Sequence, residues 1–510
     1  MDIDIVWFKR DLRCRDHSPL ISASLSGRHV LCLFVVEKER MMLQDTSNIH
    51  LNWELDNAIS LSKNLKENGL DLHFHIGTAL EKLKNLNSKY NIKRILSHEE
   101  TGNSWSYERD KRILKWCRLN DIQWEEHNSN GVIRGLKNRD YWKKERDKRM
   151  KLTLIDPPLF EKNIPYQGDI PKFENIGLEL NNLKEWPEPG EDAAIIRLNQ
   201  FLDHDSKKYN QSISSPILST KHCSRLSPYF SVGALSMRRV VQKTNKKINF
   251  IKENKDNINH HKEWIKNLSS FRRRLAWRCH FIQKLEMEPN LDLIAQNPLI
   301  EQNMNRIYDK KRFEKWANGN TGWPFFDACM RQLKCTGWIN FRMRAMMMSC
   351  ASYNLWLPRK ETGDYLAKLF LDYEPGIHWS QVGMQSGTTG INAIRAYSVT
   401  KQGKDHDPDG NYIRKWIPEL AMVPTEYIHE PWKMPIKVQK STSCLIDKNY
   451  PGPILDEMIS RKEGIKRSYS ARKGEGVREL SQRILKKHGS RNRPRKKTTQ
   501  KSSSIQKKLF

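Results

Sequence analysis

The sequence contains no run of about 20 apolar residues, the length that an α-helix needs to cross a bilayer. Its nine cysteines are scattered and form no CxxC pair, so neither a structural metal site nor a disulfide framework is expected. The first residues, MDIDIVWFKRD, have neither the basic flank nor the apolar core of a secretory signal. These absences predict a cytoplasmic protein without a membrane segment or a metal centre.

Acidic residues are scarce relative to basic ones. The 510-residue chain holds 89 Lys and Arg against 59 Asp and Glu, a formal net charge of +30 at pH 7. Such an excess favours a polyanionic partner, most simply nucleic acid. Half of it lies in residues 461–510, which carry 18 basic and 3 acidic side chains. This tail is either a solvated extension or a non-specific nucleic-acid tether, and the basic character of the rest of the chain favours the tether.

Strand-like runs alternate with amphipathic segments over the first 130 residues, which predicts a parallel sheet with crossover helices. The five runs are IDIVWF, HVLCLFVVE, LDLHFHIG, IKRILSHEE and IQWEEH. No GxGxxG follows the first run, so the usual dinucleotide fingerprint is absent, and a large cofactor is expected elsewhere.

The rest of the chain divides by composition. We expect a Rossmann-like α/β domain over residues 1–133 and a connector rich in Pro, Gly and Asn over 134–192. Helical periodicity then predicts a larger all-α domain over 193–455, followed by a basic, partly disordered tail over 456–510. We see no internal repeat.

The stretch TGWINFRMRA places Arg342 and Arg344 two residues apart in an apolar, Met-rich run. On a helix these positions point to different sides, so the two cations need different anionic partners. The acidic stretch LDYEPGIHW offers Asp372 as a partner for Arg344, which could orient a polar heterocycle beside the pair. The alternative is an ordinary ion pair between two helices.

Two further stretches carry candidate ligand-binding groups. In SFRRRLAWRCHF, Arg274 and Arg278 share one helix face and could enclose a phosphate, with Trp277 stacking on a base. The alternative is a solvated basic face. In CSRLSPYFSVGALS, Ser224 and Ser227 precede a helix and could cradle a phosphate, although a simple N-cap has the same pattern.

The order and spacing of these motifs resemble the DNA photolyase and cryptochrome flavoproteins over about nine tenths of the chain. The stretches that carry the resemblance are VWFKRDLRCRDH, CSRLSPYFSVGALS, LAWRCHF, NTGWPFFDACMRQLKCTGWINFRMRA and DPDGNYIRKWIPEL. The resemblance implies an α/β domain that often holds a light-harvesting antenna and a helical domain that holds FAD bent into a U shape. An antenna of folate or deazaflavin type is left open by the sequence.

Carried over by position, the resemblance also implies roles for individual residues. The cofactor-binding residues are Tyr209, Ser224, Arg225, Leu226, Ser227, Phe271, Arg274, Arg278, Asn340, Arg344, Asp372, Tyr373, Glu374 and His378. Trp338, Trp379 and His378 are the candidate catalytic residues, and Trp277, Arg342 and Gln402 are the candidate DNA contacts. His378 falls where the family places the residue that faces flavin N5.

The sequence departs from the family pattern on the substrate side. Arg274, Phe341 and Ala345 stand where the usual repair enzymes have Glu, Asn and Met. Losing a carboxylate and an amide removes two polar contacts to the lesion. Polar contacts of this kind give an enzyme its steepest discrimination between substrates. The pair of histidines typical of enzymes that repair (6-4) photoproducts is also missing.

The tryptophan chain that photoreduces FAD in most relatives is displaced as well. Ungapped register puts Val382, Arg359 and Arg306 at its three usual places. We expect a rewired relay that begins at Trp379 or Trp338, although a Trp in a large α-helical core is more often a packing residue.

The resemblance thus implies light-dependent, FAD-dependent repair of pyrimidine dimers, of the cyclobutane type first, by electron transfer from excited reduced flavin. The alternatives are a cryptochrome-like photoreceptor that binds FAD without repairing DNA, and a light-independent nucleic-acid-binding protein on the same scaffold. The expected partner is damaged DNA, and the protein is expected to act as a monomer.

Overall fold

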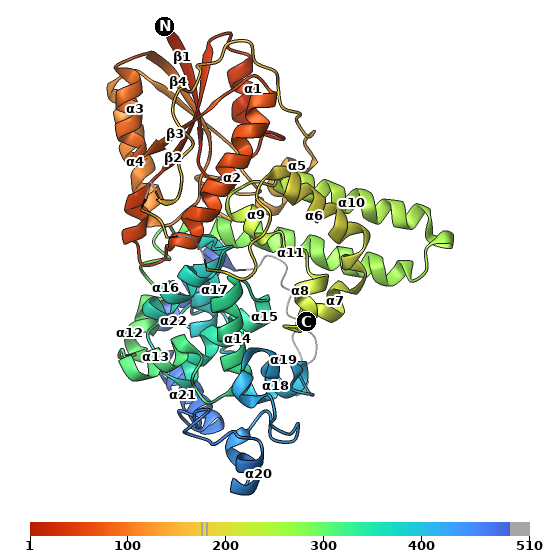
Figure 1. Cartoon of the computed structure of the whole chain (residues 1–510). Helices are drawn as coiled ribbons and strands as arrows, with labels where there is room; N and C mark the ends of the chain where they lie inside the picture. Colours follow the sequence, from red (N-terminus) through yellow and green to blue (C-terminus); the bar gives the residue numbers. More distant parts are fainter. Residues whose placement is uncertain (175–176, 180–181, 490–510) are drawn as a thin grey trace, which may run out of the picture.

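The computed structural model describes residues 1–174, 177–179 and 182–489, which form an α/β part and a larger helical part (Figure 1). The α/β part is built on a five-stranded parallel sheet with the strand order β3-β2-β1-β4-β5. Its strands are β1 Asp2–Phe8, β2 His29–Val36, β3 Leu72–Ile76, β4 Asn91–His98 and β5 Gln123–His127. The five predicted strand runs are all confirmed.

Helices cover both faces of the sheet because the buried strands present apolar side chains to both sides. Val6 and its neighbours pack with α1 (Ser18–Ser24) and α2 (Asn48–Glu67), whereas Ile5 and its neighbours pack with α3 (Ala79–Asn87) and α4 (Ser104–Leu119). This alternation places the two helix pairs on opposite sides of the sheet in Figure 1. The expected Rossmann-like parallel sheet is confirmed.

The remainder is helical, and part of it packs around a Met-rich core that includes Met343, Met346 and Met347. Its helices are α5 Trp142–Lys151, α6 Glu191–Asp203, α7 Tyr209–Ser212, α8 Leu218–His222, α9 Ser227–Ser231, α10 Met237–Glu253, α11 His261–Met287, α12 Pro298–Met304, α13 Lys310–Asn318, α14 Pro324–Thr336, α15 Phe341–Ser349, α16 Arg359–Leu369, α17 Pro375–Ser386, α18 Val399–His406, α19 Asn411–Trp416, α20 Ile436–Ser441, α21 Glu457–Ala471 and α22 Val477–His488. No helix among the described residues combines the length and the apolar character of a membrane span.

The helical part extends further than the sequence predicted. Helices α21 and α22 fall within the expected tail but pack on the domain, with Ile484 and His488 buried. Gly464 allows this packing, since a Cβ there would lie 2.1 Å from the Tyr353 carbonyl oxygen. Helices therefore continue past the predicted boundary at residue 455, and the predicted connector contains α5. Residues 490–510 lie outside the described part of the chain.

The loop after β1 connects the two parts directly. The Leu12 amide donates to the Val232 carbonyl at 3.1 Å, and the Arg13 guanidinium donates to the Gly233 carbonyl at 2.9 Å. Gly233 has φ +69°, and a Cβ there would lie 2.0 Å from the Arg10 carbonyl oxygen. Only glycine fits this contact, which sets the position of the sheet relative to the helices.

Candidate functional site

Arg344 on α15 and Asp372, just before α17, form a bidentate ion pair. Both guanidinium-to-carboxylate distances are 2.9 Å, and the Arg344 Nε also donates to the Ile339 carbonyl at 2.7 Å. Burial acts to raise the pKa of Asp372, but the charge and hydrogen bonds of Arg344, with a hydrogen bond from Ser227, outweigh it and lower the pKa. The structure thus brings together the carboxylate and the guanidinium that the sequence paired.

The Arg344 side chain keeps 24% of its surface exposed, whereas the Asp372 side chain keeps 4%. The guanidinium lies 4.2 Å from the centre of the Phe370 ring. Nearby in sequence, Asn340 donates from Nδ2 to the Ile213 carbonyl at 3.0 Å, while its buried Oδ1 has no hydrogen-bond partner among the described residues. An exposed donor surface beside an unsatisfied amide oxygen fits a polar heterocycle such as a flavin.

The expected phosphate cradle lies at the start of α9. Ser227 is the first residue of this five-residue helix, and Ser224 precedes it in the turn. Arg225 adopts a left-handed backbone with φ +55°, and its guanidinium lies 4.0 Å from the Trp338 ring centre and pairs with Glu185 at 3.3 Å. The turn therefore presents hydroxyl groups and a cation, a composition that suits a pyrophosphate.

Three of the candidate cofactor-binding residues belong to the hydrophobic core: Tyr209, Leu226 and Phe271. Leu226 is fully buried, and the Phe271 ring packs against Tyr209 at 5.9 Å and Phe201 at 4.7 Å. Their contact with a cofactor stays a prediction.

Arg278 and Glu374 lie toward the α/β part. They pair at 2.7 Å, and Arg10 from the loop after β1 approaches the same carboxylate at 3.2 Å. Arg278 also donates to the Phe230 carbonyl at 3.0 Å. This cluster joins α11, the start of α17 and the loop after β1. Its members therefore support the site from the interface between the two parts.

His378, Trp379 and Tyr373 form a compact aromatic group at the start of α17. The His378 ring lies 5.1 Å from Trp379 and 5.3 Å from Tyr373, and its Nε2 lies 2.8 Å from the Gly363 carbonyl oxygen. Burial lowers the pKa of His378 to about 4, so the imidazole is neutral near pH 7 and donates to that carbonyl.

Trp379 continues this group into a hydrogen-bonded chain. Its Nε1 donates to the Tyr373 hydroxyl at 3.0 Å, and that hydroxyl donates to Asp45 at 2.6 Å. The chain leads from the buried core toward the α/β part, which is compatible with the relay predicted to begin at Trp379.

The three positions where relatives carry the photoreduction tryptophans have other roles. Val382 is buried beside Gly363. Arg359 donates to Glu301 at 2.9 Å and to the Leu291 carbonyl at 3.2 Å. Arg306 donates to the Ser386 carbonyl at 3.0 Å and lies 4.7 Å from the ring centre of Trp356. These side chains anchor helix ends and loops.

Arg274, Trp277 and Phe341 form an exposed aromatic surface, which we call the stacking surface. The Arg274 guanidinium lies 4.7 Å from the centre of the Trp277 ring and 5.5 Å from that of Phe341. The Trp277 side chain is 48% exposed and the Phe341 side chain 41%. Exposed rings beside a guanidinium suit the stacking of bases.

The other two candidate DNA contacts differ in exposure. Arg342 is half-buried beside His406. Burial lowers the pKa of His406, and the positive charge of Arg342 lowers it further. Gln402 on α18 is 9% exposed, and its Oε1 is buried without a partner among the described residues. Whether either touches DNA stays a prediction.

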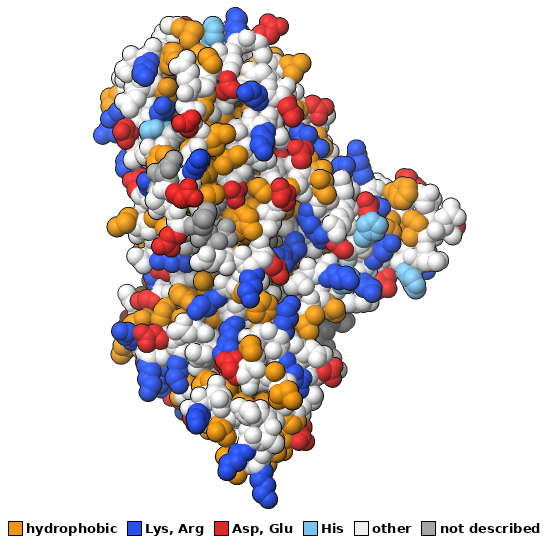
Figure 2. Space-filling model, in the orientation of Figure 1, with side chains coloured by type: hydrophobic (Ala, Val, Ile, Leu, Met, Phe, Trp, Pro, Cys, Tyr) orange, Lys and Arg blue, Asp and Glu red, His pale blue; other side chains and the backbone are white. Residues whose placement is uncertain are grey.

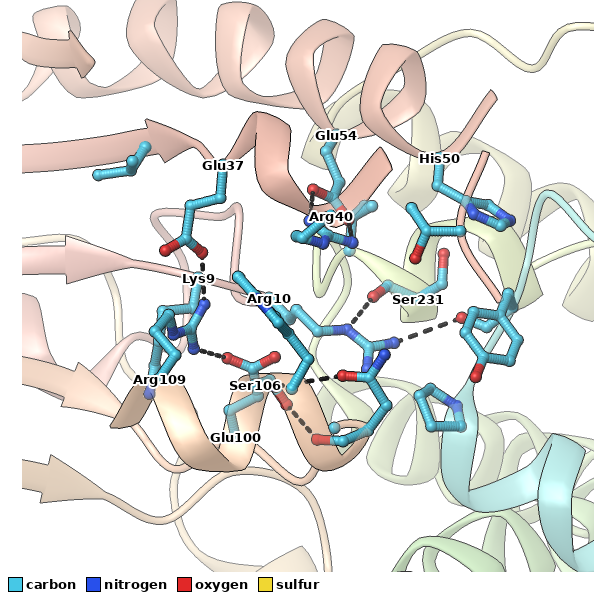
Figure 3. A pocket seen from close by; sticks show the side chains of 18 of the residues that line it. Lys9, Arg10, Glu37, Arg40, His50, Glu54, Glu100, Ser106, Arg109 and Ser231 are labelled. Carbon is cyan, nitrogen blue, oxygen red and sulfur yellow. Dashed lines mark hydrogen bonds and ion pairs between the residues drawn. The ribbon is translucent and has the colours of Figure 1, made fainter. Parts of the chain in front are cut away.

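A cavity that was not predicted from the sequence lies at the carboxyl ends of β1 and β2 against the helical part (Figure 3). Guanidinium–carboxylate pairs line it: Arg109 bonds Glu37 at 2.7 Å and Glu100 at 2.6 Å, and Arg40 bonds Glu54 at 2.8 Å. Ser231, Tyr373 and Pro375 close it from the helical part.

The sequence does contain a signal for this cavity. Open parallel sheets bind ligands at the carboxyl ends of their strands, near the point where the strand order reverses. Lys9 and Arg10 follow β1, Glu37 follows β2 and Glu100 follows β4, so charged side chains converge there. The space in and around the cavity totals about 760 Å³, a figure that includes open solvent.

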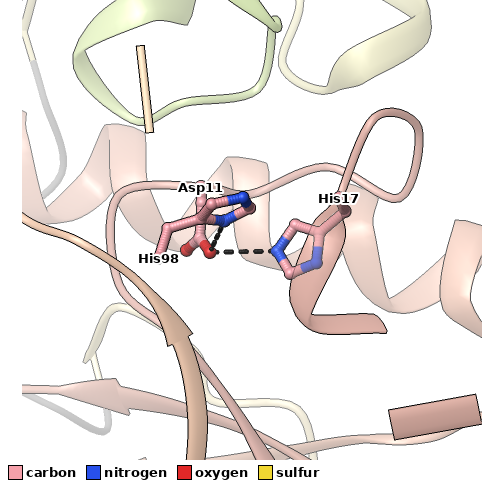
Figure 4. Close-up of side chains that lie close together, drawn as sticks. All are labelled: Asp11, His17 and His98. Carbon is pink, nitrogen blue, oxygen red and sulfur yellow. Dashed lines mark hydrogen bonds and ion pairs between the residues drawn. The ribbon is translucent and has the colours of Figure 1, made fainter. Parts of the chain in front are cut away.

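Asp11, His17 and His98 form a buried cluster at the carboxyl ends of β1 and β4 (Figure 4). The Asp11 Oδ2 lies 2.9 Å from His17 Nε2 and 2.8 Å from His98 Nδ1. His17 Nδ1 accepts from the Leu20 amide at 3.3 Å, so its Nε2 carries the proton and donates to Asp11. Burial lowers the pKa of His98 to about 3. Hydrogen bonds thus account for the geometry of this cluster.

Two family models match separate parts of the chain. Residues 4–136 match the model described as DNA photolyase, and residues 271–470 match the FAD binding domain of DNA photolyase. Together they cover the sheet, the stacking surface and the Arg344–Asp372 pair.

Whole-length relatives agree with these matches. A deoxyribodipyrimidine photo-lyase of Alkalihalophilus pseudofirmus is 28% identical over 90% of this chain and 96% of its own length. A cryptochrome DASH of Gloeobacter violaceus is 26% identical over 89% of this chain and 93% of its own length.

A solved structure extends the comparison to the fold. The crystal structure of a class III photolyase from Agrobacterium tumefaciens has a TM-score of 0.79 at 23% identity, and covers 93% of this chain and 98% of its own. The chain therefore belongs to the DNA photolyase and cryptochrome family and carries that family's FAD-binding domain.

Proposed function

We propose that the protein is a light-dependent repair lyase for pyrimidine dimers in DNA, with the cyclobutane type as its first substrate. The observation that supports this most directly is the stacking surface of Arg274, Trp277 and Phe341, which lies exposed at the FAD-binding domain. Stacking on such rings is worth about 1–3 kcal/mol per base. A net charge of +30 favours the approach of a polyanion to this surface.

Each group in the site has a defined task in this proposal. When bound, FAD supplies the light-driven electron transfer that splits the dimer. Arg344, fixed by Asp372, orients the polar edge of the ring system, and the turn at Ser224 and Ser227 holds the phosphates. Neutral His378 positions its imidazole by donating to Gly363.

The stacking surface receives the flipped lesion. Extruding a damaged nucleotide costs less than extruding an intact one, and the rings of Trp277 and Phe341 replace part of the stacking within the duplex. Arg274 adds a cation between these rings where the family's usual repair enzymes carry a carboxylate. Lesion recognition here therefore depends on stacking and charge more than on polar readout.

A cryptochrome-like photoreceptor is the second candidate, and one observation favours it. The exposed Phe341 offers no amide where the usual repair enzymes have Asn, and the buried Ala345 is smaller than their Met. A receptor that binds FAD without cleaving dimers does not need these contacts.

The cavity at the carboxyl ends of β1 and β2 suits a second chromophore. Its lining of paired guanidinium and carboxylate groups offers both donors and acceptors to a polar heterocycle, and Tyr373 and His50 add aromatic faces.

One assay tests the proposal. Purified, photoreduced protein is incubated with an oligonucleotide that contains a cyclobutane dimer, illuminated with blue light, and compared with a dark control for dimer loss. We expect light-dependent loss. If illuminated protein leaves both this substrate and a matched (6-4) substrate intact, the photoreceptor hypothesis replaces repair.

A further inference from the structure

Helices α10 and α11 form a hairpin that projects from the body of the molecule (Figure 1). Helix α11 is 27 residues long and buries one face through Trp264, Leu268, Phe271 and Leu275. At 3.6 residues per turn these residues share one side of the helix. The opposite side of α11 carries exposed side chains.

That exposed side holds a row of basic residues. Lys262, Lys266 and Arg273 are exposed and fall at relative positions 0, 4 and 11, within an arc of about 40°. Ser270 lies between them, and its hydroxyl accepts from Arg273 at 3.0 Å. We call these three basic residues the α11 row. None of the three takes part in an ion pair among the described residues.

The α11 row leads to the stacking surface. Trp277 follows Arg273 by one turn on the same side of the helix, so the row and the exposed ring form one continuous strip. From Lys262 to Trp277 the helix rises about 22 Å, at 1.5 Å per residue. This length corresponds to about six base-pair steps of duplex DNA at 3.4 Å per step.

The carboxylates near the hairpin do not neutralise the row. Glu263 lies on a neighbouring side of α11 and accepts from Gln211 at 2.9 Å. Figure 2 shows Lys and Arg side chains on the hairpin and on the helical part below it. The row therefore keeps its positive charge available to a partner in solution.

We propose that the α11 row binds the sugar–phosphate backbone of duplex DNA on one side of the lesion, so that the footprint of the protein is longer on that side. The proposal rests on the proposed function, because the lesion must occupy the stacking surface for the row to reach its flank. A linear strip of cations that starts at a base-stacking surface matches a linear array of phosphates better than it matches the patchy charge of a protein surface.

The test uses the full-length, flavin-loaded protein with Lys262, Lys266 and Arg273 all changed to Ala. A control variant carries Lys84→Ala, Arg112→Ala and Lys115→Ala, which are exposed residues of α3 and α4 on the α/β part. Binding of a dye-labelled duplex that contains one cyclobutane dimer is followed in the dark by fluorescence anisotropy at several salt concentrations.

We expect the α11 variant to bind at least tenfold more weakly at low salt, with a salt slope that is smaller by about 0.9 for every phosphate that the variant no longer neutralises. The control variant should bind like the wild type. A Lys262→Arg/Lys266→Arg variant keeps both charges and should retain wild-type affinity. Circular dichroism and the flavin-to-protein ratio verify that each variant is folded and loaded.

Flank truncation gives the geometric signature. Shortening the duplex to two base pairs on one side of the dimer should weaken wild-type binding and leave the α11 variant unaffected, while truncation on the other side should affect both alike. If the α11 variant matches the control in affinity, slope and flank dependence, the row does not bind DNA. If the wild type fails to bind the dimer duplex at all, the proposed repair function falls together with the row.

Discussion

Changing Arg344 to Ala should destabilise the helical part and release the flavin. The change leaves the Asp372 carboxylate 4% exposed, with Ser227 as its remaining side-chain hydrogen-bond partner. Removing one member of a buried ion pair costs about 3–5 kcal/mol. The Arg344 side chain keeps 24% of its surface in water, so we expect the lower end, about 3 kcal/mol.

Two companion variants separate the charge from the geometry. Arg344→Lys keeps a cation but not the two-pronged hydrogen bonding, so it should cost about 1–2 kcal/mol and retain part of the flavin. Arg344→Ala combined with Asp372→Asn removes the stranded negative charge and should be more stable than Arg344→Ala alone.

Thermal unfolding is followed by circular dichroism and by the fluorescence of the flavin that is released. The flavin content of the purified protein is measured as its flavin absorbance relative to its protein absorbance. Wild-type flavin content and melting temperature in Arg344→Ala would refute the reasoning. So would a double variant that is less stable than Arg344→Ala, since the cost could not then arise from an unpaired buried carboxylate.

Three further predictions address the DNA surface, the tail and the buried histidine. Trp277→Ala should weaken binding of a dimer-containing duplex by about 1–3 kcal/mol in an anisotropy titration, and unchanged affinity would contradict the stacking role. A chain that ends at Gly489 lacks eight basic and no acidic side chains, so it should bind DNA more weakly with a flatter salt dependence; equal affinity at low salt would exclude the tether. The pKa of His378 is about 4 in the folded state, below the value near 6.5 of an unfolded chain. The unfolded state therefore takes up the proton first as the pH falls, and the free energy of unfolding decreases by about 2 kcal/mol from pH 7 to 5. His378→Asn should flatten this part of the pH profile in thermal melts, and an unaltered profile would assign the effect to another group.

The strands and the ion pair could be predicted because their causes are local in the sequence. Apolar runs such as IDIVWF leave few alternatives to a buried parallel strand, and a buried arginine needs a carboxylate. The partner of Arg344 could be identified because Asp372 lies in a similarly apolar stretch.

The cavity at the carboxyl ends of β1 and β2 depends on contacts between distant segments. So does the continuation of the helical part past residue 455. Glu37 and Arg109 are 72 residues apart, and nothing near either one indicates the other. The packing of α21 depends on the fit of Gly464 against Tyr353, while its composition is as basic as that of a solvated tail. Composition alone therefore did not indicate these helices beyond residue 455.

Residues 371–375 contribute to both candidate cofactor sites. Leu371, Tyr373 and Pro375 face the cavity at the carboxyl ends of β1 and β2, while Asp372 between them holds Arg344. Chromophores bound at both sites would share this segment as a wall, so its conformation would bear on their distance and mutual orientation, the two quantities that govern how efficiently excitation passes between pigments. A substitution in these five residues would therefore act on both candidate sites at once.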